Sequence, residues 1–213
     1  MSTNVLFDNP GEVSDRLQQL GLDEALLLEA VYQGHLQRTR LTANHPVIYH
    51  GLNMWGEVVA ALRDQLRPLQ WVRDDIGSYA LTVNEERKLA IAVASGDEGT
   101  GNPQVHPTNR SPKGKNTVDA IEANQQLELF ELLLPESAKD EGNQTWVLMH
   151  HTDYARSEIR VELSRPLSIG KDGKITAWAE RIILRGIPFD GQLVEIDPPS
   201  GPDIDIDIQR KAS

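Results

Sequence analysis

The chain has 213 residues, of which 39% are hydrophobic and 25% charged, which fits a globular protein of one large domain or two small ones. It contains no cysteine, so disulfides, thiolate metal sites and cysteine catalysis are excluded. The formal net charge of -11 excludes a basic footprint for nucleic acid over the whole protein. Two interpretations of this charge stay open: solubility alone, or an acidic surface that mimics DNA or engages a basic partner.

Nothing in the sequence predicts a membrane segment or a secretory signal. No run of about eighteen apolar residues is present. The N-terminal stretch MSTNVLFDNPGE lacks a basic segment followed by an apolar core. We therefore expect a cytoplasmic protein of the bacterial type.

The first third of the chain predicts three helices. Asn9 caps the first, Pro10 occupies its first turn, and Gly21 ends it. The second covers 23–34 and the third 53–66, because each carries an apolar stripe at helical spacing.

The middle of the chain changes to a strand pattern. Segments 78–83 and 88–94 flank a short polar turn and predict a β-hairpin. A glycine-rich segment, 96–117, follows, and Thr117 is expected to cap a helix over 118–133.

The last third returns to strands, which we expect at 145–151, 157–164 and 176–185, with a turn at Asp172 and Gly173. Helices followed by antiparallel strands indicate the α+β class. The prediction is an N-terminal helical part packed on a mainly antiparallel sheet, with one long helix crossing it.

Three regions are expected. Residues 1–68 form the helical part, 69–196 the α+β sheet domain, and 197–213 a C-terminal tail or edge strand. The tail carries three isoleucines that alternate with aspartates after a Pro- and Gly-rich stretch. It is open whether this tail lies on the sheet as an edge strand, adds to a partner's sheet, or has no fixed structure.

The 96–117 segment is the first candidate for a binding site. It fails the Walker pattern, because Asn109 replaces the first glycine and Asn116 the hydroxyl residue. It also fails the dinucleotide pattern, because Gln104 replaces the third glycine. The segment still combines glycines, three basic side chains and a helix start, which predicts an anion site. The candidate residues are Gly99, Gly101, Arg110, Lys113, Lys115 and Thr117. The alternative is a structural surface loop.

A divergent Mg²⁺ nuclease is a second possibility. Such a site needs carboxylates for the metal and a lysine near the scissile phosphate. Asp75, Glu86, Lys88 and Glu98 supply these residue types, although Glu86 and Lys88 fall in a turn before a strand and not at its end. Solvated turn charges are the alternative.

The histidines predict no metal centre. His150 and His151 are adjacent, so a strand directs them to opposite faces. A cluster of His45, His50 and one of this pair would depend on the tertiary structure. The four tryptophans are expected to anchor the core.

No catalytic motif passes a spacing test, so the sequence leaves enzymatic activity open and names no cofactor. The first hypothesis is a non-enzymatic regulatory or complex-forming protein that acts through a macromolecular partner, either another protein or a second copy of itself. The alternative is a phosphate-handling or nucleic-acid-processing enzyme that uses the 96–117 segment, and nucleic acid would contact only this local basic loop.

Overall fold

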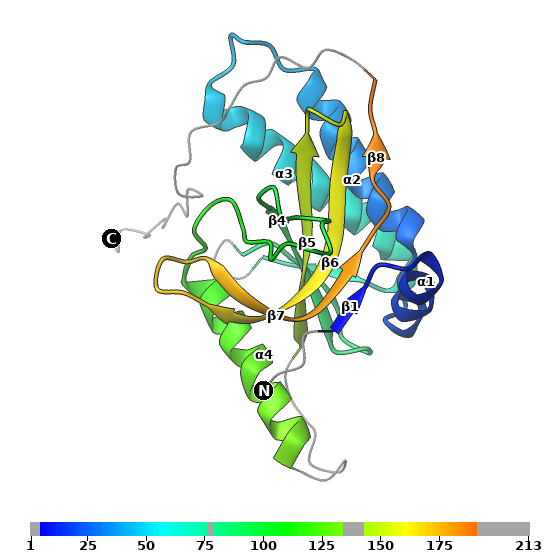
Figure 1. Ribbon diagram of the computed structural model, residues 1–213, viewed down its shortest axis with the longest axis vertical. Coiled ribbons are helices and arrows are strands. Elements are labelled where there is room, and N and C mark those ends of the chain that lie inside the picture. Colours follow the sequence, from blue (N-terminus) through cyan, green and yellow to red (C-terminus); the bar gives the residue numbers. More distant parts are fainter. Residues whose placement is uncertain (1–4, 76–78, 134–142, 191–213) are drawn as a thin grey trace, which may run out of the picture.

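The chain folds into a central sheet with the three N-terminal helices on one face and a single later helix on the other (Figure 1). The computed structural model describes residues 5–75, 79–133 and 143–190, and only the backbone of 127–133. Within this part, four α-helices pack on a mixed, mostly antiparallel sheet of eight strands. The α+β class is therefore confirmed.

The three N-terminal helices are α1 (Pro10–Gln19), α2 (Glu24–Thr39) and α3 (Val47–Leu66). The expected cap at Asn9 is confirmed, and Asp23, the first residue of the second predicted segment, caps α2. The Asn9 side chain accepts a hydrogen bond from the Gly11 amide at 3.0 Å, and the Asp23 side chain accepts from the Ala25 amide at 2.7 Å.

Two of these helices are longer than the sequence pattern predicts. Helix α2 continues five residues past Gly34, and α3 begins six residues before Asn53. Gly34 does not end the helix but lies at the contact between α2 and α3. A Cβ there would lie 2.3 Å from Cγ2 of Val58, so the missing side chain allows α2 and α3 to approach each other closely.

The sheet has the order β1-β7-β6-β5-β4-β3-β2, and β8 pairs with β6. Neighbouring strands are antiparallel, except for the parallel pairs β4–β5 and β1–β7. The expected hairpin and the three long C-terminal strands are confirmed, whereas β1, β2 and β8 are short and were not expected. The strands are β1 (Val5–Phe7), β2 (Val72–Asp74), β3 (Leu81–Asn84), β4 (Leu89–Ser95), β5 (Gln144–Asp153), β6 (Glu158–Ile169), β7 (Ile175–Ile183) and β8 (Ile187–Pro188).

Strand alternation divides the core between the two faces of the sheet. On β5, Trp146 and Leu148 belong to the larger cluster, which α1, α2 and α3 cover. Val147 and Met149 belong to the smaller cluster, together with Ile121 of α4. The N-terminal helices and the strands thus share one hydrophobic core. Trp71, Trp146 and Trp178 are buried, as expected of core anchors.

Helix α4 (Lys115–Leu133) connects the parallel strands β4 and β5 on the second face. The buried Asn124 fixes the helix to the sheet, because its side chain accepts from the Thr145 amide and donates to the Thr145 carbonyl, both at 2.8 Å. The expected start is wrong. Thr117 does not cap the helix but lies buried in its first turn, where its amide donates to the Gly114 carbonyl at 3.1 Å.

Two further sequence predictions concern the C-terminal tail and the absence of a membrane-spanning segment. The tail at 197–213 lies outside the described residues, so its three alternatives stay predictions. Among the described helices, none combines the length and the apolar character needed to cross a membrane.

Candidate functional site

The 96–117 segment is held to the second face of the sheet by buried polar side chains. Asn109 is fully buried, and its side chain donates to the Gly173 carbonyl at 2.9 Å and accepts from the Ile175 amide at 2.7 Å. The indole of Trp178 donates to the Pro107 carbonyl at 2.9 Å. These contacts tie the segment to the start of β7 and replace the backbone pairing that a strand would provide.

A buried ion pair holds the other half of the segment. Glu162 and Arg181 face each other at 2.7 Å and are both excluded from solvent. Arg181 also donates to the carbonyls of Val105, at 2.9 Å, and Asn102, at 3.2 Å. Glu162 accepts from the Gly101 amide at 2.8 Å. Each charge is therefore paired and hydrogen-bonded, which is the condition for burying it.

The glycines of the predicted anion site serve this packing. Gly101 adopts a φ of +69°, and a Cβ there would lie 2.9 Å from Cβ of Arg160, so only glycine fits comfortably. Its amide is bound by Glu162, and the Gly99 amide donates to the Asp97 carboxylate at 3.0 Å. Both N–H groups that were expected to cradle an anion donate to the protein's own carboxylates.

The basic residues of that prediction lie along the end of the segment. Arg110 is exposed, and its amide donates to the Ser95 carbonyl at 2.8 Å. Lys113 is half-buried beside Gly173, and Lys115 is the exposed first residue of α4. The hypothesis of an anion site therefore depends on these three side chains and on no cradle of glycine amides.

The residues of the nuclease hypothesis are not brought together. Glu86 and Lys88 lie in the turn between β3 and β4, whereas Glu98 follows the opposite end of β4. Asp75 follows β2 and forms an ion pair with Arg63 of α3. No group of three histidine, aspartate or glutamate side chains within the described residues is arranged to hold a metal ion.

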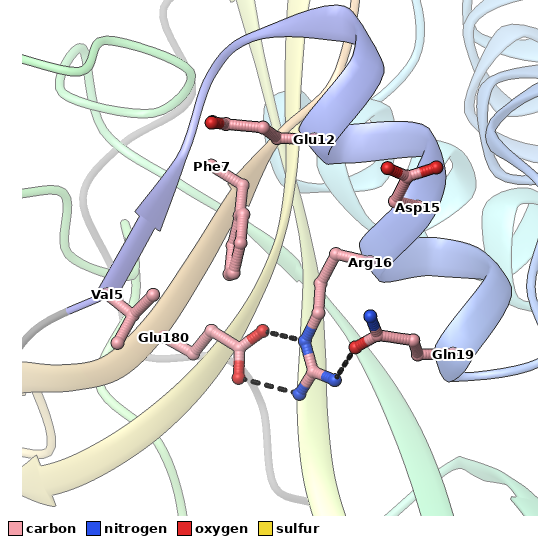
Figure 2. Close-up of a pocket in the computed structure, with 7 residues that line it drawn as sticks. All are labelled: Val5, Phe7, Glu12, Asp15, Arg16, Gln19 and Glu180. Carbon is pink, nitrogen blue, oxygen red and sulfur yellow. Dashed lines mark hydrogen bonds and ion pairs between the residues drawn. The ribbon is translucent and has the colours of Figure 1, made fainter.

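A surface hollow of about 460 Å³ lies between β1, α1 and β7 (Figure 2). Arg16 crosses it and pairs with Glu180, with Nη2 donating to Oε2 at 2.9 Å. Arg16 also donates to the Gln19 side chain at 2.8 Å and lies 5.9 Å from the ring centroid of Trp146. The cation is thus fully engaged, and the hollow offers a structural ion pair and no catalytic arrangement.

A continuous apolar stripe runs along α3, with spacings that alternate between four and three residues. Its members are Ile48, Leu52, Trp55, Val59, Leu62 and Leu66. From Trp55 onward the stripe packs against the core, and the Trp55 indole donates to the Val93 carbonyl of β4 at 3.2 Å. Such a pattern marks one face of an amphipathic helix.

The first two turns of α3 present the stripe residues Ile48 and Leu52 to solvent, together with their neighbours Val47 and Tyr49. The exposed fractions are 39% for Val47, 45% for Ile48, 41% for Tyr49 and 54% for Leu52. We call these four residues the docking face. Gly51 and Gly56 flank it, and a Cβ built at either would meet no atom within 4 Å among the described residues. The face is therefore open on both sides to an approaching backbone.

Three histidines gather around Arg38, on the side of α3 that faces α2 and β5. His35 comes from α2, His50 from α3 and His150 from β5, and each is at least 96% buried. Arg38 donates to the Thr152 hydroxyl at 3.5 Å and lies 5.9 Å from the Tyr154 ring centroid. We call His35, His50 and His150 the histidine cluster.

Burial is the main cause of a lowered pKa in all three imidazoles, and the positive charge of Arg38 adds to it. For His150 the pKa falls to about 3. The opposite-face prediction for the histidine pair is confirmed. His151 lies on the second face, and its Nδ1 is 3.3 Å from the Gly96 carbonyl.

The sequence pattern did not indicate the docking face, because the helix was expected to begin at Asn53. The regular spacing from Ile48 to Leu66 is the signal that could have extended it. The sequence hypothesis was a cluster of His45, His50 and one of the pair His150 and His151. It did not include His35 or Arg38, which share no motif with these histidines.

Comparison with models of known protein families, with curated proteins and with solved structures gives no match.

Proposed function

We propose that this chain is a non-enzymatic, complex-forming protein that binds an amphipathic helix of another protein through the docking face. The observation that carries this proposal is the exposure of Ile48 and Leu52 in register with the buried part of the same stripe. This helix face belongs to the core over its second half, and the described residues leave its first half uncovered.

The energetic argument follows from area. Burying a leucine or isoleucine side chain contributes roughly 1.5–3 kcal/mol, so two neighbouring residues of this kind form a plausible binding centre. Tyr49 adds an aromatic ring with a polar end, a residue type common at the centre of interfaces. Ile48 and Leu52 are four positions apart, and Leu52 and Trp55 are three apart, which matches the i, i+3 and i+4 anchors of helices that bind apolar grooves.

Charge selects the class of partner. Between positions 47 and 62 the only charged residue is Glu57, and the first basic residue is Arg63. Nucleic acid needs lysine and arginine against its phosphates, which this face does not supply. The two flanking glycines favour close approach of a second helix backbone. An apolar helix face with basic residues at its rim fits both this surface and the acidic chain.

The test compares Leu52→Glu with the matched control Leu69→Glu. Leu69 is also an exposed leucine, 43% accessible, but lies outside the docking face. Each full-length variant is expressed in the native host, and co-purified proteins are quantified. A protein retained by the wild type and by Leu69→Glu, and lost at least tenfold with Leu52→Glu, is then purified and titrated directly against all three.

Two outcomes contradict the proposal. One is an identical set and amount of retained proteins for Leu52→Glu and the wild type. The other is a wild-type protein that sediments as a dimer while Leu52→Glu sediments as a monomer, because the occupant is then a second copy of this chain.

A further inference from the structure

The histidine cluster lies directly behind the docking face. His50 follows Tyr49 in the first turn of α3 and is the first buried residue of that helix. His45 stacks on the Tyr49 ring with centroids 5.9 Å apart and meets the His50 ring edge-on at 6.2 Å. His50 therefore connects the histidine cluster to the same two turns of α3 that carry the docking face.

These imidazoles are buried without full hydrogen bonding. His35 Nδ1, His50 Nε2 and His150 Nε2 have no hydrogen-bond partner within the described part of the chain. Buried polar atoms without a hydrogen-bond partner are uncommon in native proteins, and each lowers the stability of the fold. His35 also packs on Phe189, which follows β8, with ring centroids 4.8 Å apart. The cluster therefore joins α2, α3, β5 and the β8 segment.

The groups around the cluster are basic. Arg38 acts on all three rings, His45 acts on His50, and Lys113 and His151 act on His150. A proton taken up here would add positive charge beside positive charge in a dry region. The folded arrangement accordingly favours the neutral imidazoles, and only an arrangement that admits water accommodates the charged ones.

We propose that protons regulate the docking face: in mild acid the histidine cluster becomes charged and releases the first two turns of α3, and the surface for the partner is lost. This inference rests on the proposed function for its consequence, but the release itself can be measured without any partner. His50 is the only buried residue within 47–53, since the stripe residues Ile48 and Leu52 are exposed there, so these two turns depend on His50 for their attachment.

The expected size of the pH effect follows from the linkage between proton binding and opening. A histidine that takes up a proton only after opening, with an ordinary pKa of about 6.5, raises the open population about tenfold between pH 7.5 and 5.5. Three such groups acting together raise it further. The effect is absent above about pH 7.5, where the ordinary imidazole is neutral in either arrangement.

The experiment is hydrogen exchange on the full chain at about pH 7.5 and 5.5, corrected for the intrinsic pH dependence of exchange. We expect the backbone amides of 41–53 to lose at least tenfold protection in mild acid, while those of 56–66, which pack on the sheet, lose less. The double variant His50→Gln/His150→Leu should show a pH response at least tenfold smaller. His106→Gln, in an exposed part of the 96–117 segment, should respond like the wild type.

Protection of 41–53 that is independent of pH would overturn the inference, and so would a full pH response in the double variant. A protein that opens at 41–53 in mild acid but still binds the purified partner would also overturn the inference. The proposal of the docking face would then still stand. Failure of the proposed function is a separate result, since it appears as unchanged binding by Leu52→Glu at about pH 7.5.

Discussion

Trp55 donates its indole N–H to the backbone carbonyl of Val93 at 3.2 Å, and this bond marks the place where α3 leaves the sheet. Every member of the stripe after Trp55 is buried, and the two before it are exposed. The same kind of side chain therefore belongs to the core on one side of the bond and is exposed, within the described part of the chain, on the other.

The first prediction separates these two parts of the stripe. Leu52→Glu should change the free energy of unfolding by less than about 0.5 kcal/mol, because the side chain is exposed. Leu62→Ala should lower it by about 2–5 kcal/mol, because Leu62 is fully buried. Urea denaturation of both variants measures this. A large loss for Leu52→Glu would mean that this position is part of the core.

The second prediction concerns the buried ion pair under the 96–117 segment. Glu162→Gln should lower the free energy of unfolding by about 3–5 kcal/mol, because it leaves the Arg181 charge buried without its partner. The double variant Glu162→Gln/Arg181→Met should recover part of this loss. Chemical denaturation provides the measurement, and equal stability of the wild type and Glu162→Gln would contradict the role assigned to the pair.

The third prediction concerns Asn109, which joins the segment to β7. Asn109→Leu should destabilise the protein by about 1–3 kcal/mol, because it leaves the Ile175 amide without its acceptor, whereas the Gly173 carbonyl keeps the hydrogen bond from the Lys113 amide. Limited proteolysis should then cut the segment faster. Asn102→Ala is the control, because the Asn102 side chain accepts only from the Gln104 amide at the surface and should behave like the wild type.

The fourth prediction is the dependence of stability on pH. Folding lowers the pKa of His35, His50 and His150, chiefly through burial, so the unfolded chain binds more protons below about pH 6.5. The histidine contribution to stability is complete above that value and declines as the pH falls toward the folded pKa, which for His150 is about 3. Thermal unfolding between about pH 8 and 5 tests this, and His150→Leu should flatten the curve.

The fifth prediction separates partner binding from phosphate handling. Lys113→Ala/Lys115→Ala should leave partner binding unchanged at about pH 7.5, where the histidine cluster is neutral, because neither residue belongs to the docking face. Calorimetric titration with inorganic phosphate and pyrophosphate should show no binding to the wild type that this variant loses. A saturable site abolished by the double variant would support the enzyme hypothesis instead.

Local signals in the sequence were sufficient for most of the fold. The caps at Asn9 and Asp23, the hairpin and the alternation of the C-terminal strands each depend on neighbouring residues. Gly34 misled the prediction because glycine at a helix end and glycine at a helix crossing look alike until the second helix is placed. Thr117 misled it for a similar reason, since a threonine near a helix start fits either the cap or the first turn.

The candidate site needed the tertiary structure. Exposure of Leu52 depends on where the sheet stops beneath α3, which no local pattern records. The glycines of the 96–117 segment resembled ligand-binding glycines because both uses need a free backbone, and only the positions of Asp97 and Glu162 show which use applies. His35 and His50 lie on two different helices, and His150 lies 100 positions after His50 on a strand, so their proximity follows from packing alone.

The most direct test of the docking face is site-specific photo-crosslinking in the native host, with a benzoylphenylalanine placed in turn at positions 48, 52 and 69 of the full chain. The proposal predicts one protein of another sequence joined to the chain from positions 48 and 52, and not from position 69, with the joined peptide coming from an amphipathic helix. Absence of an adduct at 48 and 52, or the same adducts from all three positions, would contradict it.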